Sequence, residues 1–146
     1  MFTHLLPNSN KLFSVKFTSY AEKHYLNSFK KKYKGKIWEF TELSIKEDLS
    51  RLRTINNTTQ KSNQIDELKY NDNTWLAKYD FKIAGSNQST KASGNRCILY
   101  ININEDIIEI LLIYNKTDIP KNKKETKYIM DEISKNNNSK LKELII

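Results

Sequence analysis

The amino-acid sequence predicts an α+β fold: an N-terminal strand and a helical hairpin packed on a small antiparallel β-sheet, followed by a C-terminal helix. Two patterns carry this prediction. Apolar and aromatic residues recur at helical spacing between residues 19 and 55, and residues 74–117 contain three apolar runs of strand length. Because the two patterns occupy separate parts of the chain, helices segregated to one face of an antiparallel sheet are favoured over alternating strand–helix units.

The first expected elements are a strand and two closely joined helices. Residues 11–17 alternate in polarity, as a strand does. Thr18 or Ser19 can cap the helix that follows, and this helix is expected to stop at Gly35 within a cluster of lysines. The second helix carries an apolar stripe made of Trp38, Ile45, Leu49 and Leu52. Because the connection at Gly35 is short, the two helices are expected to form an antiparallel hairpin.

Three strands of a meander are expected next, after a polar, Asn-rich connection at residues 56–73. Residues 75–83 alternate completely, with apolar side chains on one face and charged ones on the other. Residues 95–103 repeat the alternation, whereas residues 107–114 are nearly all aliphatic, as in a strand covered on both faces. Because residues 104–106 form a short polar turn, the last two strands are expected to pair as a hairpin. The result is a meander with a basic face.

A C-terminal helix is expected at residues 121–135, after Pro120 has interrupted the strand pattern. Residues 136–146 are expected to form a tail and residues 1–10 a flexible leader. A single domain is therefore expected to span residues 11–135.

The chain is strongly basic, with a formal net charge of +8 over 146 residues. This balance favours an anionic partner, namely nucleic acid, an acidic protein or an anionic membrane surface. A general enrichment in Lys, Asn and Ile is the alternative explanation of the charge. The single cysteine, Cys97, excludes an internal disulfide and suits a reducing compartment. The sequence shows no signal-peptide pattern and no apolar run of membrane-spanning length, so a cytoplasmic protein without a membrane partner is expected.

Several kinds of active site are disfavoured by the residues present. His4 and His24 are the only histidines, and neither has Cys, Asp or Glu at metal-ligand spacing, so both are expected at the surface and no metal is expected. With only three glycines in the chain, a Gly-rich loop for a phosphate or a dinucleotide is implausible, and no cofactor is expected. Buried packing is expected for Cys97 rather than nucleophilic catalysis.

Basic and phenolic residues converge instead on the meander and the helix after it. The candidate site residues are Lys78, Lys82, Arg96, Lys116 and Tyr128. Arg96 is expected to be exposed, where the second meander strand begins. Cations neutralise a phosphate and the charge of its transition state, and a Lys or Tyr can relay a proton, so this set suits phosphodiester chemistry. A solvated basic face without chemistry is the competing interpretation.

Three segments carry a resemblance to a known family: KYDFK at residues 78–82, SGNRCILY at residues 93–100 and LLIYNK at residues 111–116. They follow a strand and two helices and precede a helix that contains a tyrosine. In this order they resemble the RelE/ParE superfamily of type II toxins. The similarity covers residues 11–135, and the specific identities fall between residues 78 and 128.

The resemblance implies a fold like that of microbial ribonucleases and the activity of the RelE branch. RelE toxins cut mRNA in the ribosomal A site, where the ribose 2′-hydroxyl attacks the adjacent phosphate. By position, Arg96 matches the arginine that stabilises the phosphate, and Tyr128 matches the tyrosine that stacks on or orients the substrate. Lys78, Lys82 and Lys116 match basic positions of the family. The partners implied are a cognate antitoxin and mRNA on the ribosome, with no small-molecule cofactor.

Two departures from the family pattern leave three alternatives to this function open. Asp80 lies between the two lysines where RelE itself has another lysine, and the loop at residues 85–93 is longer than usual in the family. A ParE-like member would poison a topoisomerase through protein contacts. A basic module could bind RNA or DNA without catalysis, and a degenerate toxin could retain only the fold.

Overall fold

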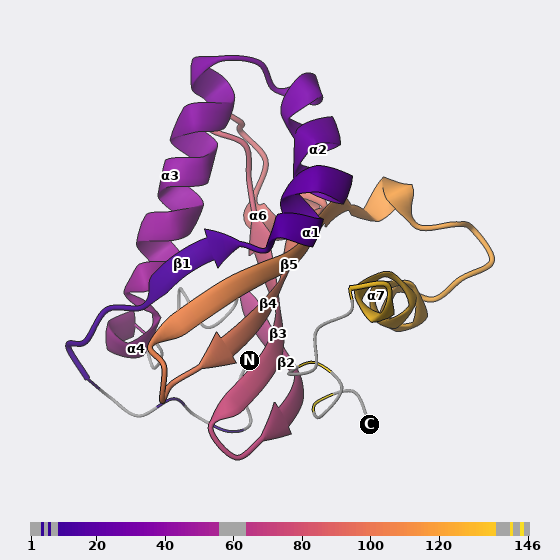
Figure 1. The fold of residues 1–146 in the computed structure, drawn as a ribbon. Coiled ribbons are helices and arrows are strands. Elements are labelled where there is room, and N and C mark those ends of the chain that lie inside the picture. Colours follow the sequence, from indigo (N-terminus) through magenta and orange to yellow (C-terminus); the bar gives the residue numbers. More distant parts are fainter. Residues whose placement is uncertain are drawn as a thin grey trace.

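The computed structural model describes residues 4, 6, 9–55, 64–136, 141 and 144 of the chain. These residues form an α+β fold around a five-stranded mixed sheet (Figure 1), so the predicted fold class is confirmed. In chain order the elements are β1 (Ser14–Phe17), α1 (Ser19–Ala21), the π-helical η1 (Glu22–Leu26), α2 (Asn27–Lys32), α3 (Lys36–Ser50), α4 (Leu52–Ile55), β2 (Ile65–Asn71), β3 (Thr74–Phe81), α6 (Thr90–Ser93), β4 (Asn95–Asn102), β5 (Ile107–Asn115), the 3-10 helix η2 (Lys116–Asp118) and α7 (Glu125–Ser134).

The sheet has the strand order β1-β5-β4-β3-β2. Strands β3, β4 and β5 form the predicted antiparallel meander. Strand β1, however, pairs with β5 in parallel, with Ser14 opposite Ile107 and Phe17 opposite Ile110. The prediction of an antiparallel sheet is therefore wrong at this edge. Its cause is that the alternation of polarity in a strand fixes which side chains share a face and carries no information on the direction of the neighbouring strand.

Strand β2 occupies part of the segment that the sequence predicts to be a connection. It pairs antiparallel with β3 through a two-residue turn at residues 72–73, where Asp72 has a φ of 55°. As the last strand of the sheet, β2 buries Ile65 and leaves most of its other side chains partly or fully exposed. A polar composition is tolerated on such an edge strand, which is why the segment does not show an apolar run. Residues 56–63 of the expected connection lie outside the described residues.

The helical hairpin forms where the sequence predicts it. The Thr18 side chain accepts a hydrogen bond from the Ala21 backbone N–H at 3.0 Å, so the predicted cap is confirmed. The first helix contains a π-helical segment, η1, that the sequence does not predict. After α2 ends, Gly35 adopts a φ of 68°, a left-handed backbone that glycine allows without steric cost, and α3 begins at the next residue.

Both faces of the sheet are covered. Figure 1 shows α2 and α3 on one side of the sheet and α7 on the other. The larger core lies under the hairpin and joins Phe29, Trp38 and Leu49 to the inward side chains of the meander. The smaller core lies under α7, and its buried members include Leu76, Ile98, Tyr100, Leu112, Ile129 and Ile133. The predicted basic face is therefore wrong over most of its length, because these apolar side chains occupy it and α7 buries them.

A group of charged residues lies at one end of the face that α7 covers. There α6, a short helix within the predicted loop, lies between the end of β3 and the start of β4, and Gly94 closes α6 with a φ of 73°. At the C-terminal end, α7 begins at Glu125, four residues later than expected. Leu141 and Leu144, from the expected tail, are buried in the smaller core. Among the described residues, no helix combines the length and the apolar character that crossing a membrane requires.

Candidate functional site

The end of the sheet beside α6 brings polar residues of three strands into a row. Asp80 of β3 lies opposite Arg96 of β4, and Arg96 lies opposite Tyr114 of β5. Lys78 precedes Asp80 by two residues and shares its face of β3. Glu125, the first residue of α7, contacts this row from above the sheet. These five side chains are called the charged cluster below.

Glu125 is the centre of the contacts in the charged cluster. Its carboxylate forms an ion pair with the Arg96 guanidinium and accepts a hydrogen bond from the Tyr114 hydroxyl at 2.7 Å. Lys78 Nζ lies 3.4 Å from the other carboxylate oxygen. Arg96 Nε also lies 3.2 Å from Asp80 Oδ1, although these two atoms are not aligned for a hydrogen bond. With two cations and two carboxylates, the formal charges of the cluster cancel.

Burial and hydrogen bonding act differently on the two carboxylates. Burial raises the pKa of Asp80, and the nearby charges of Arg96 and Lys78 offset this only in part. Burial also acts to raise the pKa of Glu125, but hydrogen bonds from Tyr114 and Arg96 outweigh it, so the pKa lies below its usual range. The pKa of the Tyr114 hydroxyl is raised, chiefly by burial and then by its hydrogen bond to Glu125. At neutral pH the site therefore holds an ionised Glu125 beside a phenol that keeps its proton.

The structure brings some of the sequence-predicted site residues together and not others. Lys78 and Arg96 both belong to the charged cluster, and the ring centroid of Tyr128 lies 5.4 Å from that of Tyr114. Lys82 follows the end of β3 and lines a hollow with residues of α3. The prediction that Lys82 shares a face with Lys78 is therefore wrong. Lys116 is exposed at the start of η2, and its aliphatic stem packs against Gly94.

Arg96 is less accessible than the sequence suggests. Only 17% of its side chain is exposed, and the guanidinium pairs with two carboxylates, those of Asp80 and Glu125. The expectation of an exposed arginine is therefore wrong. The local sequence does not reveal this burial, because the covering helix α7 comes from a segment almost thirty residues further along the chain.

Sequence reasoning missed Glu125 and Tyr114. Tyr114 ends an aliphatic run, a pattern that predicts a core position, and its ring does belong to the smaller core. Glu125 lies three residues before Tyr128 on one helix, and residues with this spacing share a face. The i,i+3 relation to a residue already singled out is the signal that could have placed Glu125 in the site.

A cavity of about 230 Å³ opens beside the charged cluster. Its walls come from η1 and α2 on one side and from β5, η2 and α7 on the other. Tyr114 and Tyr128 both line it. Because the hydroxyl of Tyr114 donates to Glu125, the cavity and the charged cluster share this side chain.

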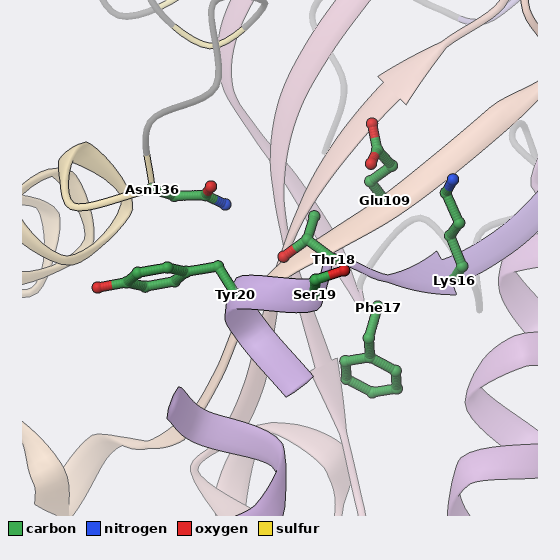
Figure 2. Close-up of a pocket in the computed structure, with 7 residues that line it drawn as sticks. All are labelled: Lys16, Phe17, Thr18, Ser19, Tyr20, Glu109 and Asn136. Atoms are coloured by element: carbon green, nitrogen blue, oxygen red, sulfur yellow. The ribbon is translucent and has the colours of Figure 1, made fainter. Parts of the chain in front are cut away.

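A second hollow, of about 480 Å³, lies at the β1 edge of the sheet (Figure 2). Lys16 and Glu109 are partners in the β1–β5 register, and Figure 2 shows both side chains pointing to the same side, with Phe17 pointing to the other. The hollow also takes in Tyr20 and Asn136. It contains none of the five residues of the charged cluster, which lies across β3, β4 and β5.

In the part of the chain that the structure describes, no three His, Cys, Asp or Glu residues are grouped so that they could hold a metal ion. Comparison of the chain with protein-family models, curated proteins and solved structures gave no match.

Proposed function

We propose that the protein is the toxin of a type II toxin–antitoxin pair, a RelE-like endoribonuclease that acts on mRNA at the ribosome in the cytoplasm. The observation that carries this proposal is the convergence of Lys78, Arg96 and Glu125 at one end of the sheet. Two cations can hold a phosphodiester, and a carboxylate beside them can accept a proton. The order of strand, helical hairpin, meander and helix supports a RelE-like fold as part of the same proposal.

In this mechanism Glu125 accepts the proton of a ribose 2′-hydroxyl while the 2′-oxygen attacks the adjacent phosphorus. The bond from phosphorus to the 5′-oxygen breaks, and the leaving oxygen takes a proton from the Lys78 ammonium. The products are a 2′,3′-cyclic phosphate and a free 5′-hydroxyl. Arg96 donates to the non-bridging oxygens, where negative charge develops in the transition state. Tyr114 keeps its proton and orients the Glu125 carboxylate.

The contacts of Glu125 account for how it becomes a base. Without substrate, the Arg96 guanidinium hydrogen-bonds to the carboxylate and helps to lower its pKa. When a phosphate takes over the donors of Arg96, Glu125 loses this stabilising partner and gains a neighbouring negative charge. Both changes raise the pKa of the carboxylate and make it a stronger base. The substrate thus activates its own proton acceptor.

The remaining candidate residues have supporting roles in the proposal. Tyr128, beside Tyr114, orients the substrate. Lys82 and Lys116 are exposed outside the charged cluster and attract the RNA backbone. The positive net charge also suits a cognate antitoxin that neutralises the basic surface. Co-expression with the product of the neighbouring gene is expected to give a complex and to relieve toxicity, and the absence of both would remove this partner.

The test of the function is growth arrest on expression, followed by primer extension on ribosome-bound mRNA. Glu125→Gln keeps the shape of the side chain and an acceptor for Tyr114, so it is expected to fold and to lose about 10²- to 10⁴-fold in cleavage rate, the range for general acid–base catalysis. Asp131→Asn is the matched control, because Asp131 lies on α7 and pairs with Lys123 and Lys127 outside the cluster. Full cleavage by Glu125→Gln would contradict the mechanism.

One observation favours a second candidate, a nucleic-acid-binding module without catalysis. The charged cluster is neutral as a whole, and Glu125 is positioned to fix α7 on the sheet without doing chemistry. In this case the basic surface alone would bind RNA or DNA. Binding of RNA by the purified protein together with an absence of cleavage on the ribosome would favour this candidate.

A further inference from the structure

Helix α3 carries an apolar patch on the side that faces away from its buried residues. The patch consists of Ile37, Phe40 and Leu43, each of which is at least 50% exposed. Figure 1 shows α3 at the margin of the fold, with this side turned away from the sheet. The outer side of a surface helix is normally polar, so a patch of large apolar side chains there is typical of an interaction surface.

The patch belongs to a stripe with the spacing of a coiled coil. Residues 36, 40, 43 and 47 follow one another at intervals of four, three and four, which places them on one face of α3. Phe40 and Leu43 occupy the centre of the stripe, and Lys36 and Glu47 occupy its two ends. Ile37 lies beside Phe40 and widens the apolar centre. Such a stripe is complementary to a second copy of itself that runs in the opposite direction.

We propose that α3 pairs antiparallel with α3 of a second copy of this chain, about a two-fold axis that passes between residues 41 and 42. In this register Phe40 packs against the partner's Leu43, and Lys36 meets the partner's Glu47. Because the interface is two-fold symmetric, each contact is made twice. Among the residues that the structure describes, neither Lys36 nor Glu47 is held in an ion pair of its own chain. This inference goes beyond the proposed function and does not depend on it.

The charges select the antiparallel direction. A parallel pair would place Lys36 beside the partner's Lys36 and Glu47 beside the partner's Glu47. It would also bring together the lysines that precede α3 in the two copies, namely Lys30, Lys31, Lys32 and Lys34. In the antiparallel pair these lysines lie at opposite ends of the 15-residue helix, about 22 Å apart at about 1.5 Å per residue. This exceeds the screening length of about 8 Å at physiological salt, so their repulsion is small.

The charge of α3 also favours a second copy over the other partners of a basic protein. Its acidic residues outnumber its basic ones, with Glu39, Glu42, Glu47 and Asp48 against Lys36 and Lys46. An RNA backbone or an acidic protein is therefore attracted to other surfaces of the chain. The contact of one helix with one helix belongs to the small class of interfaces, below about 1,200 Å². The dimer is accordingly weak and forms as the protein concentration rises.

Sedimentation equilibrium of the purified protein alone tests the pairing, at concentrations up to about 1 mM. The average mass is expected to rise with concentration from the chain mass of 17.2 kDa toward twice that value. Leu43→Lys is expected to keep the protein monomeric and folded, because the new ammonium lies four residues from both Glu39 and Glu47 and supports the helix. Tyr70→Ala, at an exposed tyrosine on β2, is the matched control and is expected to associate like the wild type.

Exchange of the end charges tests the register. Lys36→Glu and Glu47→Lys each place like charges opposite one another, so each is expected to weaken association roughly ten-fold. An equimolar mixture of the two variants is expected to regain wild-type association, and so is the chain that carries both changes, because every contact then joins opposite charges again.

Two results would overturn this pairing. One is a wild-type protein that stays monomeric at about 1 mM. The other is a chain with both charge changes that associates no better than the single variants. If the wild type is monomeric and Leu43→Lys abolishes its complex with the product of the neighbouring gene, the patch binds that partner and not a second copy.

Discussion

Replacing Arg96 with alanine is expected to destabilise the protein strongly. The sequence alone predicts an exposed strand end, where a substitution normally changes the free energy of unfolding by about 0.5 kcal/mol or less. In the structure, removal of the guanidinium leaves Asp80, whose side chain is 6% exposed, without its nearest cation. It also removes the ion pair that joins Glu125 of α7 to the sheet. The larger cost is the carboxylate left buried.

The size of the effect follows from burial. Removing one partner of a fully buried ion pair costs about 3–5 kcal/mol. The Arg96 side chain is 17% exposed and that of Glu125 is 26% exposed, so water can reach part of the site. We therefore expect a loss of about 2–4 kcal/mol in the free energy of unfolding. For a chain of this length, such a loss lowers the melting temperature by roughly 10 °C.

Thermal melts at several pH values test this expectation. Arg96 acts to lower the pKa of Asp80, which burial raises, so Arg96→Ala raises this folded-state pKa further. A carboxyl whose folded pKa is raised destabilises the fold above that pKa and ceases to do so when the pH falls through it. The difference in melting temperature between wild type and variant is therefore largest at neutral pH and shrinks as the solution is acidified.

A double variant provides the control for this reasoning. Adding Asp80→Asn to Arg96→Ala removes the buried charge and is expected to recover part of the lost stability, since both members of the pair are then neutral. Lys116→Ala, at an exposed lysine of the same basic set, is expected to melt within about 1 °C of wild type. Two results would show that loss of the buried ion pair does not explain the effect. One is a melting temperature of Arg96→Ala equal to that of Lys116→Ala. The other is a double variant, Arg96→Ala with Asp80→Asn, that is less stable than Arg96→Ala alone.

Three further predictions concern positions outside the charged cluster. Gly94→Ala is expected to lower the free energy of unfolding by about 1–2 kcal/mol, because φ is 73° there and an added Cβ would lie 2.9 Å from Lys116 Cγ. In denaturant titrations, adding Lys116→Ala to this variant should recover part of the lost stability, since it removes the contacting Cγ. Arg53→Ala is expected to lower the melting temperature more than Lys11→Ala, although both side chains pair with Asp106, because Arg53 is 5% and Lys11 is 68% exposed. Cys97 is fully buried with a raised pKa, so its labelling by a thiol reagent should follow the rate of unfolding; fast labelling of the native protein would contradict its placement.

The elements predicted best from the sequence are those whose own side chains face a core on one side. The meander is found within a residue or two of its predicted bounds. The prediction succeeds because the apolar side chains that alternate in residues 75–83 are those buried under the hairpin. The same holds for α3, whose buried Trp38, Ile45 and Leu49 are the predicted stripe. Strand β2 escaped prediction because an edge strand needs few apolar residues to be held by hydrogen bonds to its neighbour.

The candidate site was predicted only as far as its strands determine it. Arg96 and Lys78 share a face because of strand periodicity, and this follows from sequence. What the other face of the sheet meets depends on how α7 returns to it, which no local pattern encodes. The presence of Glu125 in the site therefore could not be predicted from the strands. Lys82 lies outside the site because β3 ends at Phe81, whereas the alternation in the sequence continues to residue 83.

The positions of the charges separate attraction of a substrate from chemistry. The net charge is +8, yet the charged cluster contributes nothing to it, so the excess of positive charge lies on other surfaces. Lys31, Lys32 and Lys34 are exposed at the end of α2 and just after it, and Lys32 also lines the cavity beside the charged cluster. In the proposed function, we therefore expect an RNA backbone to be attracted first by the lysines of the hairpin. A neutral cluster does not attract anions by net charge, so under the proposed mechanism it binds a phosphate only when that phosphate displaces Glu125 from Arg96.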